Sequence, residues 1–99
     1  MLDIDSLDGF EWDEGNLAKN WDRRQGSRAE CEEVFLNVPL VLADAVMHSA
    51  HEARYYALGQ TNHGRLLFIA FTVRGTRIRM ISARPMRGKE RQIYGQANP

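Results

Sequence analysis

The chain has 99 residues, 43% of them apolar, a length that allows one domain with a single core. Its single cysteine, Cys31, excludes an internal disulfide framework and a multi-cysteine zinc site. No apolar run approaches the roughly 20 residues of a membrane-spanning helix, and the first five residues include two Asp where a signal peptide would be basic. We therefore expect one domain over residues 1–99 that is cytoplasmic and has no contact with a membrane.

The formal net charge of zero hides a division of charge along the chain. Residues 1–52 carry twelve acidic and four basic side chains, whereas residues 53–99 carry nine basic and one acidic. Eleven of the thirteen cations are Arg, whose planar guanidinium can hold a phosphate through two hydrogen bonds. This asymmetry indicates that one surface meets a polyanion, or that the two halves face each other. A basic face that serves only solubility is the simpler alternative.

The first part of the chain predicts a short extended segment and then a helix. Residues 10–12 contain two large apolar side chains and predict a strand or an extended lead-in. Asp13 suits a helix N-cap, and Leu17 and Trp21, four residues apart, would share the buried face of a helix that ends near Gly26.

A second helix is predicted to begin at Ser27, because Ser27 and Glu30 have the spacing of a capping box. Cys31 lies on the apolar face of this helix, where we expect a buried, inert thiol. The helix should end before Pro39, since the residue before a proline avoids the helical region.

From residue 40 onward the pattern favours strands. Four apolar runs fit: residues 40–43, 54–58, 66–73 and 76–82. The third is apolar on both faces, as expected of a central strand. Residues 86–94 predict a short helix. The whole pattern predicts an α+β fold with two N-terminal helices, an antiparallel sheet of about four strands and a short C-terminal helix.

The last predicted strand carries arginines that could bind phosphate. Strict alternation puts Arg77 and Arg79 on one face with Ile81, whereas Arg84 falls on the other phase if regular geometry continues that far. Pro85 restricts Arg84 to an extended conformation. The alternative is a solvent-facing strand whose Arg stems cover apolar surface.

Residues 44–54 gather acidic, basic and imidazole groups beside a predicted strand. His48 could act as a general acid or base near neutral pH, and a loop-capping hydrogen bond is the alternative. Glu52 and Arg54 would share one face of a strand, where they could pair. His48 and His51 are weak grounds for zinc without further ligands, so we expect neither a metal nor a cofactor.

An ordered set of segments spans most of the chain. These are residues 10–14, 19–21, 32–35, 48–49 with Glu52 and Arg54, 64–65, 78–84, and 89–91 with Tyr94. In this order and spacing they resemble the BrnT family, the ribonuclease half of a bacterial type II toxin–antitoxin pair, over about residues 10–94. The resemblance implies a RelE-like α+β fold, metal-free cleavage of messenger RNA, and neutralisation by a BrnA-type antitoxin. It also implies that DNA is contacted only indirectly, through the antitoxin.

The resemblance assigns roles to the residues singled out above. Arg79 and Arg84 would stabilise the phosphate, His48 would carry the proton, and Glu52 would orient His48 or pair with Arg54. The flanking RNA backbone would be held by further basic residues: Arg24, Arg65, Arg77, Lys89 and Arg91.

Two other functions stay open. Arg24 stands where many relatives carry a histidine, which is compatible with a degenerate toxin that binds nucleic acid or an antitoxin without catalysis. A structural subunit whose acidic half pairs with the basic half of a neighbouring copy would need only the division of charge.

Overall fold

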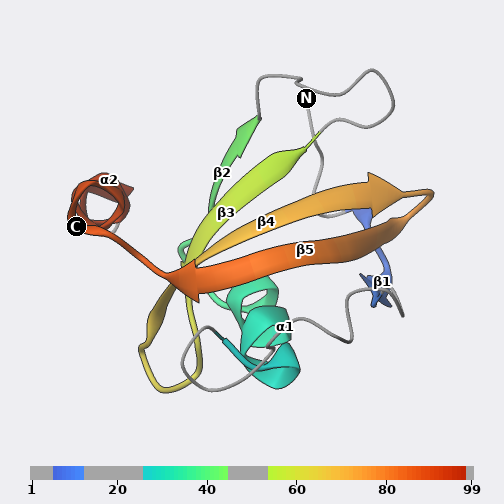
Figure 1. Ribbon diagram of the computed structural model, residues 1–99, viewed down its shortest axis with the longest axis horizontal. Helices are drawn as coiled ribbons and strands as arrows, with labels where there is room; N and C mark the ends of the chain where they lie inside the picture. The colour runs from blue at the N-terminus through green and yellow to red at the C-terminus, as the bar shows by residue number, and fades with distance from the viewer. Residues whose placement is uncertain (1–5, 13–25, 45–53, 98–99) are drawn as a thin grey trace.

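The computed structural model describes residues 6–12, 26–44 and 54–97, which form two helices and five strands. Figure 1 shows α1 below the sheet and α2 beside the end of β5. In chain order the elements are β1 (Gly9–Glu11), α1 (Arg28–Leu36), β2 (Val41–Asp44), β3 (Tyr55–Gln60), β4 (Leu66–Arg74), β5 (Arg77–Pro85) and α2 (Gly88–Ala97).

The five strands form one mixed sheet in the order β1-β5-β4-β3-β2. β1 pairs with β5 in parallel, and the other neighbours are antiparallel. The prediction of an antiparallel sheet of about four strands is therefore wrong. The error arises from β1, because its partner strand begins at Arg77, far along the chain, and cannot be identified from the local sequence pattern.

The prediction of two N-terminal helices is also wrong. In the described part of the chain, α1 lies between β1 and β2, and α2 follows β5. The overall class is α+β, with one helix in the middle of the chain and one at its end. The predicted first helix, with Leu17 and Trp21, falls on residues 13–25, which lie outside the described residues.

The start and end of α1 follow from its sequence. The Glu30 backbone N–H donates to Ser27 Oγ at 3.2 Å, and the Ser27 N–H donates to Glu30 Oε1 at 3.0 Å, which confirms the capping box. The helix ends at Leu36, ahead of Pro39. Cys31 is fully buried, and burial raises the pKa of its thiol to about 12, as expected of an inert cysteine.

The sheet has apolar contacts on both faces, which explains why β4 is apolar throughout. The larger cluster joins α1 to one face and consists of Cys31, Val34, Ala57, Leu67, Ile69, Phe71, Ile78 and Met80. The smaller one, on the other face, joins Met86 and Tyr94 to Leu58. The Tyr94 hydroxyl donates to the Pro39 carbonyl at 2.8 Å. α2 therefore packs at one end of the second face.

Candidate active site on the sheet

Arg79 and Arg84 lie on the same face of the sheet. Thr72 of β4 pairs with Arg79, and Phe68, four residues earlier, pairs with Arg84. Residues an even number apart on a regular strand share a face. Over one step of β4 the register passes from Met80 to Ser82, so β5 holds an extra residue there and changes phase, as at a β-bulge. The expectation that Arg84 points away from Arg79 is therefore wrong.

The guanidinium of Arg84, near the end of β5, is bound by a residue in the first turn of α2. Its Nη1 and Nη2 donate to Glu90 Oε1 and Oε2 at 2.8 and 2.6 Å, and Nη1 also donates to the Pro85 carbonyl at 3.1 Å. The guanidinium carbon lies 4.1 Å from the centroid of the Phe68 ring. These bonds use three of the five N–H donors of a guanidinium. The orientation of Arg84 is therefore set by both a carboxylate and an aromatic ring.

The ion pair changes the pKa of both partners. The hydrogen bond from Arg84 lowers the pKa of Glu90, and the Arg87 backbone N–H, 2.8 Å from Glu90 Oε1, lowers it further. The hydrogen bond to Glu90 raises the pKa of Arg84. Glu90 thus joins the end of β5 to the first turn of α2, where a carboxylate also interacts favourably with the helix dipole.

Glu90→Gln is expected to lower the free energy of unfolding at pH 7 by about 1–2 kcal/mol, because it removes a charged hydrogen-bond acceptor. A lowered carboxyl pKa contributes stability that is fully present above the ordinary value of 4.5 and is lost as pH falls through the lowered value. The free energy of unfolding of the variant should therefore fall less than that of the wild type as the pH is lowered below 4.5. Urea titrations at several pH values measure both effects, and the same acid dependence in both proteins would contradict this role.

The other predicted arginines of β5 form a group with residues of neighbouring strands. Arg79 pairs with Thr72 on one side and with Glu11 of β1 on the other. Arg54 is the residue before Tyr55, which begins β3 and pairs with Phe71, the chain neighbour of Thr72. One row across the sheet therefore holds Thr72, Arg79 and Glu11, and Arg54 lies just beyond the end of β3.

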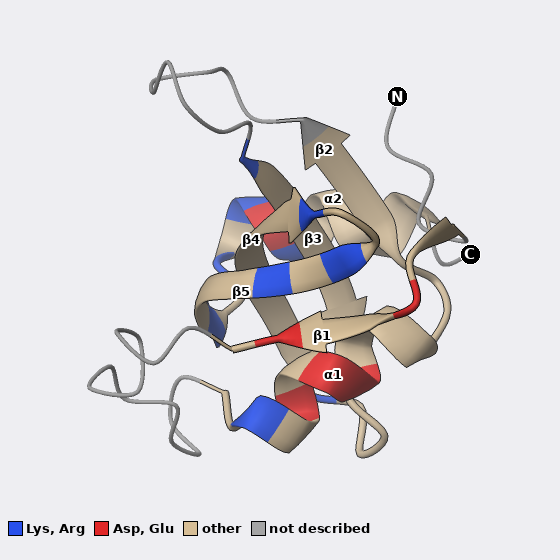
Figure 2. Cartoon of the chain, turned by 90° about the vertical axis from the view of Figure 1, so that its right-hand side faces the viewer, with Lys and Arg blue, Asp and Glu red and all other residues tan. Residues whose placement is uncertain are grey.

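The next row adds two more cations. Arg74 pairs with Arg77, and Arg74 Nη1 lies 3.8 Å from Glu11 Oε1. We call Arg54, Arg74, Arg77 and Arg79 the arginine cluster. Figure 2 shows the basic segments of β5 together with acidic ones on β1 and α1. Thr72 is 2% exposed and Arg79 is half-buried, whereas Arg54, Arg74 and Arg77 are exposed.

Arg84 lies apart from the arginine cluster. Phe68 and Thr72 are four residue steps apart on β4, about 13 Å at 3.3 Å per step. Tyr56 bridges this interval, since its ring stacks on Phe68 with centroids 5.1 Å apart. The face thus carries the arginine cluster at one end and a Tyr56–Phe68–Arg84 stack that leads to α2.

The remaining predicted residues are distributed differently. His48, Glu52 and Arg24 lie outside the described residues. The connection that carries His48 and Glu52 leaves β2 at Asp44, which pairs with Tyr55, at the end of the sheet that holds the arginine cluster.

Three predicted RNA contacts lie elsewhere. Arg65 Nη1 donates to both carboxylate oxygens of Glu30, at 3.1 and 3.3 Å. Burial alone would raise the pKa of Glu30, but hydrogen bonds from Ser27 and Arg65 lower it. This pair links the segment just before β4 to α1, away from the arginine cluster. Lys89 and Arg91 are exposed on α2.

Glu11 and Arg74 were not predicted as site residues. For Glu11 the signal is present in the sequence, because a charged residue between the apolar Phe10 and Trp12 indicates a strand with one polar face. Arg74 falls one residue beyond the strand predicted over residues 66–73, whereas it is the last residue of β4.

Within residues 6–12, 26–44 and 54–97, no three His, Cys, Asp or Glu side chains are grouped as a metal site would require. Neither helix described here has the length and apolar character needed to span a bilayer.

Comparison with known proteins identifies the family. No curated protein matches the chain. The family described as "Ribonuclease toxin, BrnT, of type II toxin-antitoxin system" matches residues 12–90, which include Arg54, Arg74, Arg77, Arg79 and Arg84. Since this match covers most of the 99 residues, the resemblance noted in the sequence is confirmed: the chain belongs to the BrnT family of ribonuclease toxins of type II toxin–antitoxin systems.

Proposed function

We propose that this chain cleaves RNA without a metal ion, with the arginine cluster holding the scissile phosphate and His48 transferring the proton. The observation that carries the proposal is the row across the sheet in which Arg79 pairs with Thr72 on one side and Glu11 on the other, with Arg54 next to the first residue of β3. Membership of the BrnT family supports RNA as the substrate.

The reaction needs only groups that the chain and the RNA supply. A base removes the proton of the ribose 2′-hydroxyl, and O2′ attacks the adjacent phosphorus. The bond from phosphorus to O5′ breaks, an acid protonates O5′, and a cyclic 2′,3′-phosphate remains. Negative charge grows on the phosphate oxygens during the attack, and guanidinium groups fixed in advance stabilise it. Arg79 and Arg54 are proposed for this role.

The proton transfer is assigned to His48, because imidazole titrates near neutral pH. Glu52 is proposed to orient His48. Both residues belong to the connection whose ends, Asp44 and Arg54, adjoin the arginine cluster, and this supports the assignment.

Glu11 supplies a carboxylate beside Arg74, which limits how far the Arg74 side chain can turn toward the RNA.

Other basic residues are proposed to bind RNA on either side of the cleaved bond. Arg84 would contact a phosphate further along the chain with its remaining donors, and Tyr56 offers a ring face on which an unpaired base can stack. The other proposed contacts to the flanking backbone are Arg24, Arg65, Arg77, Lys89 and Arg91.

A BrnA-type antitoxin is the proposed partner, and the cytoplasm is the proposed location. Family membership implies an antitoxin of some kind, because type II systems pair a toxin with a protein antitoxin.

The test is cleavage of labelled single-stranded RNA by protein treated with EDTA. The wild type is expected to cleave at the same rate with and without the chelator and to leave cyclic phosphate ends. His48→Gln should lower the rate by about 10²–10⁴-fold and remove the limb of the pH–rate profile that belongs to imidazole.

A rate that falls on chelation and returns with added metal would contradict the metal-free reaction. RNA that is bound but left intact by the wild type would favour the non-catalytic binding module, for which Arg24 in place of a histidine is the supporting observation. In that case the logarithm of the binding affinity should still fall linearly with the logarithm of the salt concentration, without cleavage.

A further inference from the structure

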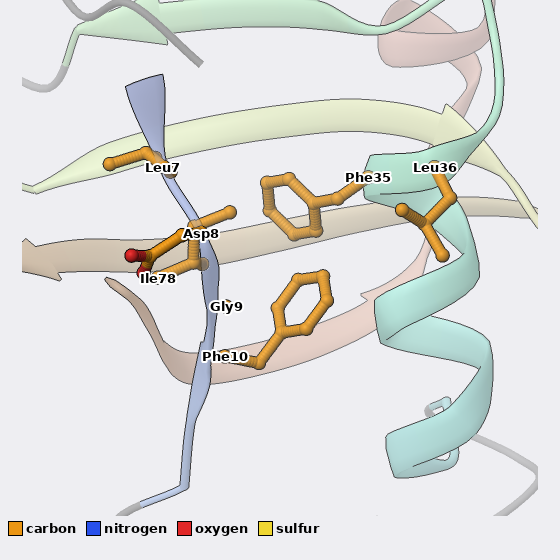
Figure 3. Close-up of a pocket in the computed structure, with 7 residues that line it drawn as sticks. All are labelled: Leu7, Asp8, Gly9, Phe10, Phe35, Leu36 and Ile78. Carbon is orange, nitrogen blue, oxygen red and sulfur yellow. The ribbon is translucent and has the colours of Figure 1, made fainter. Parts of the chain in front are cut away.

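An apolar groove lies between β1 and the C-terminal half of α1, on the face of the sheet opposite the arginine cluster. Its volume is about 410 Å³. Figure 3 shows the rings of Phe10 and Phe35 between the strand and the helix, with Leu36 on the helix side. The two ring centroids are 5.9 Å apart. Leu7 and Ile78 complete the apolar lining.

The groove continues into an exposed apolar surface at the end of α1. Leu36 is 75% exposed, and Val38, two residues later, is 82% exposed. Among the residues that the structure describes, one other large apolar side chain is exposed, Ile93 on α2. Leu36 lines the groove, whereas Val38 lines a neighbouring hollow with Asn37 and Gln60. Single exposed apolar residues are common, but one that lines an apolar groove and has a second one two residues along is typical of an interaction site.

Two glutamates lie beside Leu36 on the surface of α1. Glu32 and Glu33 precede it by four and three residues on α1 and therefore lie beside it on the helix surface. The last turn of α1 contains no basic residue, so nothing on the helix offsets the partial negative charge of its C-terminal carbonyl groups.

Carboxylates lie in the groove and on the helix beside it. Asp8, the residue before β1, lines the groove, and its Oδ1 accepts a hydrogen bond from Thr76 Oγ1 at 2.8 Å. Glu32, four residues before Leu36 on α1, accepts a hydrogen bond at Oε2 from Trp12 Nε1 at 2.9 Å. Arg28 lies over the Trp12 ring, 5.2 Å from its centroid, and is the cation of the first turn of α1. The groove therefore disfavours RNA and suits a protein segment that combines apolar and basic side chains.

We propose that this groove binds a cationic amphipathic segment of the antitoxin. A large apolar side chain of the segment would lie against Phe10, Phe35 and Leu36, and its Lys or Arg side chains would lie beside Glu32 and Asp8. The proposal rests on the proposed function, because it takes the occupant to be the antitoxin of this toxin. The scissile phosphate and the antitoxin segment then lie on opposite faces of the sheet.

The test is titration of purified toxin variants with the antitoxin encoded beside this chain. Leu36→Lys is expected to weaken binding by about 10- to 100-fold, because it removes an apolar anchor and places a cation against the cations of the partner. RNA cleavage by the variant alone should stay at the wild-type rate. Since Leu36 is 75% exposed, the substitution should not disturb folding. Ile93→Lys is the matched control and should bind within about twofold of the wild type.

A second variant tests the charge separately. Glu32→Gln retains an acceptor for Trp12 but removes the negative charge. It is expected to weaken antitoxin binding by about two- to fivefold and to reduce the dependence of affinity on salt concentration.

Binding of Leu36→Lys with wild-type affinity, or no binding of the antitoxin to the wild type, would overturn the proposal. Two other results would also overturn it. If the wild type is a dimer that Leu36→Lys dissociates without a change in antitoxin affinity, the occupant of the groove is a second copy of the chain. If Leu36→Lys binds RNA more weakly, the occupant is RNA. If the wild type cleaves no RNA, and Leu36→Lys no longer binds the antitoxin that the wild type binds, the ribonuclease proposal is rejected and the proposed antitoxin site in the groove is supported.

Discussion

Arg79→Ala should lower RNA cleavage by about 10²–10³-fold. Arg79 pairs with Thr72 on one side and with Glu11 on the other, and Arg74 and Arg77 pair further along the same two strands. Removing one preorganised donor from a site where charge develops typically has an effect of this size. Arg79→Lys keeps the charge but loses the planar pair of donors, and is expected to recover only part of the rate. Single-turnover cleavage of labelled RNA measures the effect.

Two controls separate catalysis from folding and from general charge. The melting curve of Arg79→Ala should correspond to a change in unfolding free energy below about 1 kcal/mol. Arg91→Ala removes an exposed arginine of α2 and should change the cleavage rate by less than about tenfold, through weaker backbone binding. Equal loss of activity in both variants would contradict a special role for Arg79.

Phe71→Ala should destabilise the protein by about 3–5 kcal/mol. The ring is fully buried in the larger cluster, 5.1 Å from the ring of Phe35 in an edge-on contact and 5.5 Å from the ring of Tyr55 in a stacked one. A loss of this size is a large fraction of the 5–15 kcal/mol typical of a domain. Urea-induced unfolding followed by circular dichroism provides the measurement.

The matched control is Ile93→Ala, which truncates an apolar side chain that is 44% exposed on α2. It should cost less than about 1 kcal/mol. Comparable losses in the two variants would mean that the core does not depend on the Phe71 ring.

The elements that depend on local interactions could be predicted from the sequence. The capping box between Ser27 and Glu30, and the end of the helix before Pro39, involve residues only a few positions apart. Two-sided burial of the central strand was also predictable, because residues 66–73 are apolar on both faces. In the structure β4 lies third in the sheet and contacts both clusters.

The relation of Arg79 to Arg84 could not be predicted, because it depends on a single extra residue. Strict alternation places positions 79 and 84 on opposite faces. The bulge at Ile81 restores them to one face, and nothing in the local sequence marks that position. The geometry of Arg84 depends likewise on a tertiary contact with Glu90, on a different element.

The position of β1 was unpredictable for a different reason. Three residues of strand contain too little pattern to specify a partner, and this partner lies 68 positions further along the chain, where Gly9 pairs with Arg77. Parallel pairing over such a separation is determined by packing of the whole domain. Glu11 could therefore be expected on a strand, but its place beside Arg79 could not.

β1 contributes one side chain to each of the two proposed surfaces. Phe10 lies in the groove, and the next residue, Glu11, lies beside the arginines on the opposite face. A ligand that favours one position of this short edge strand alters the environment of both residues at once. Whatever factor the protein partner imposes on affinity for nucleic acid, nucleic acid must impose on affinity for the partner, because coupling between two binding equilibria is reciprocal.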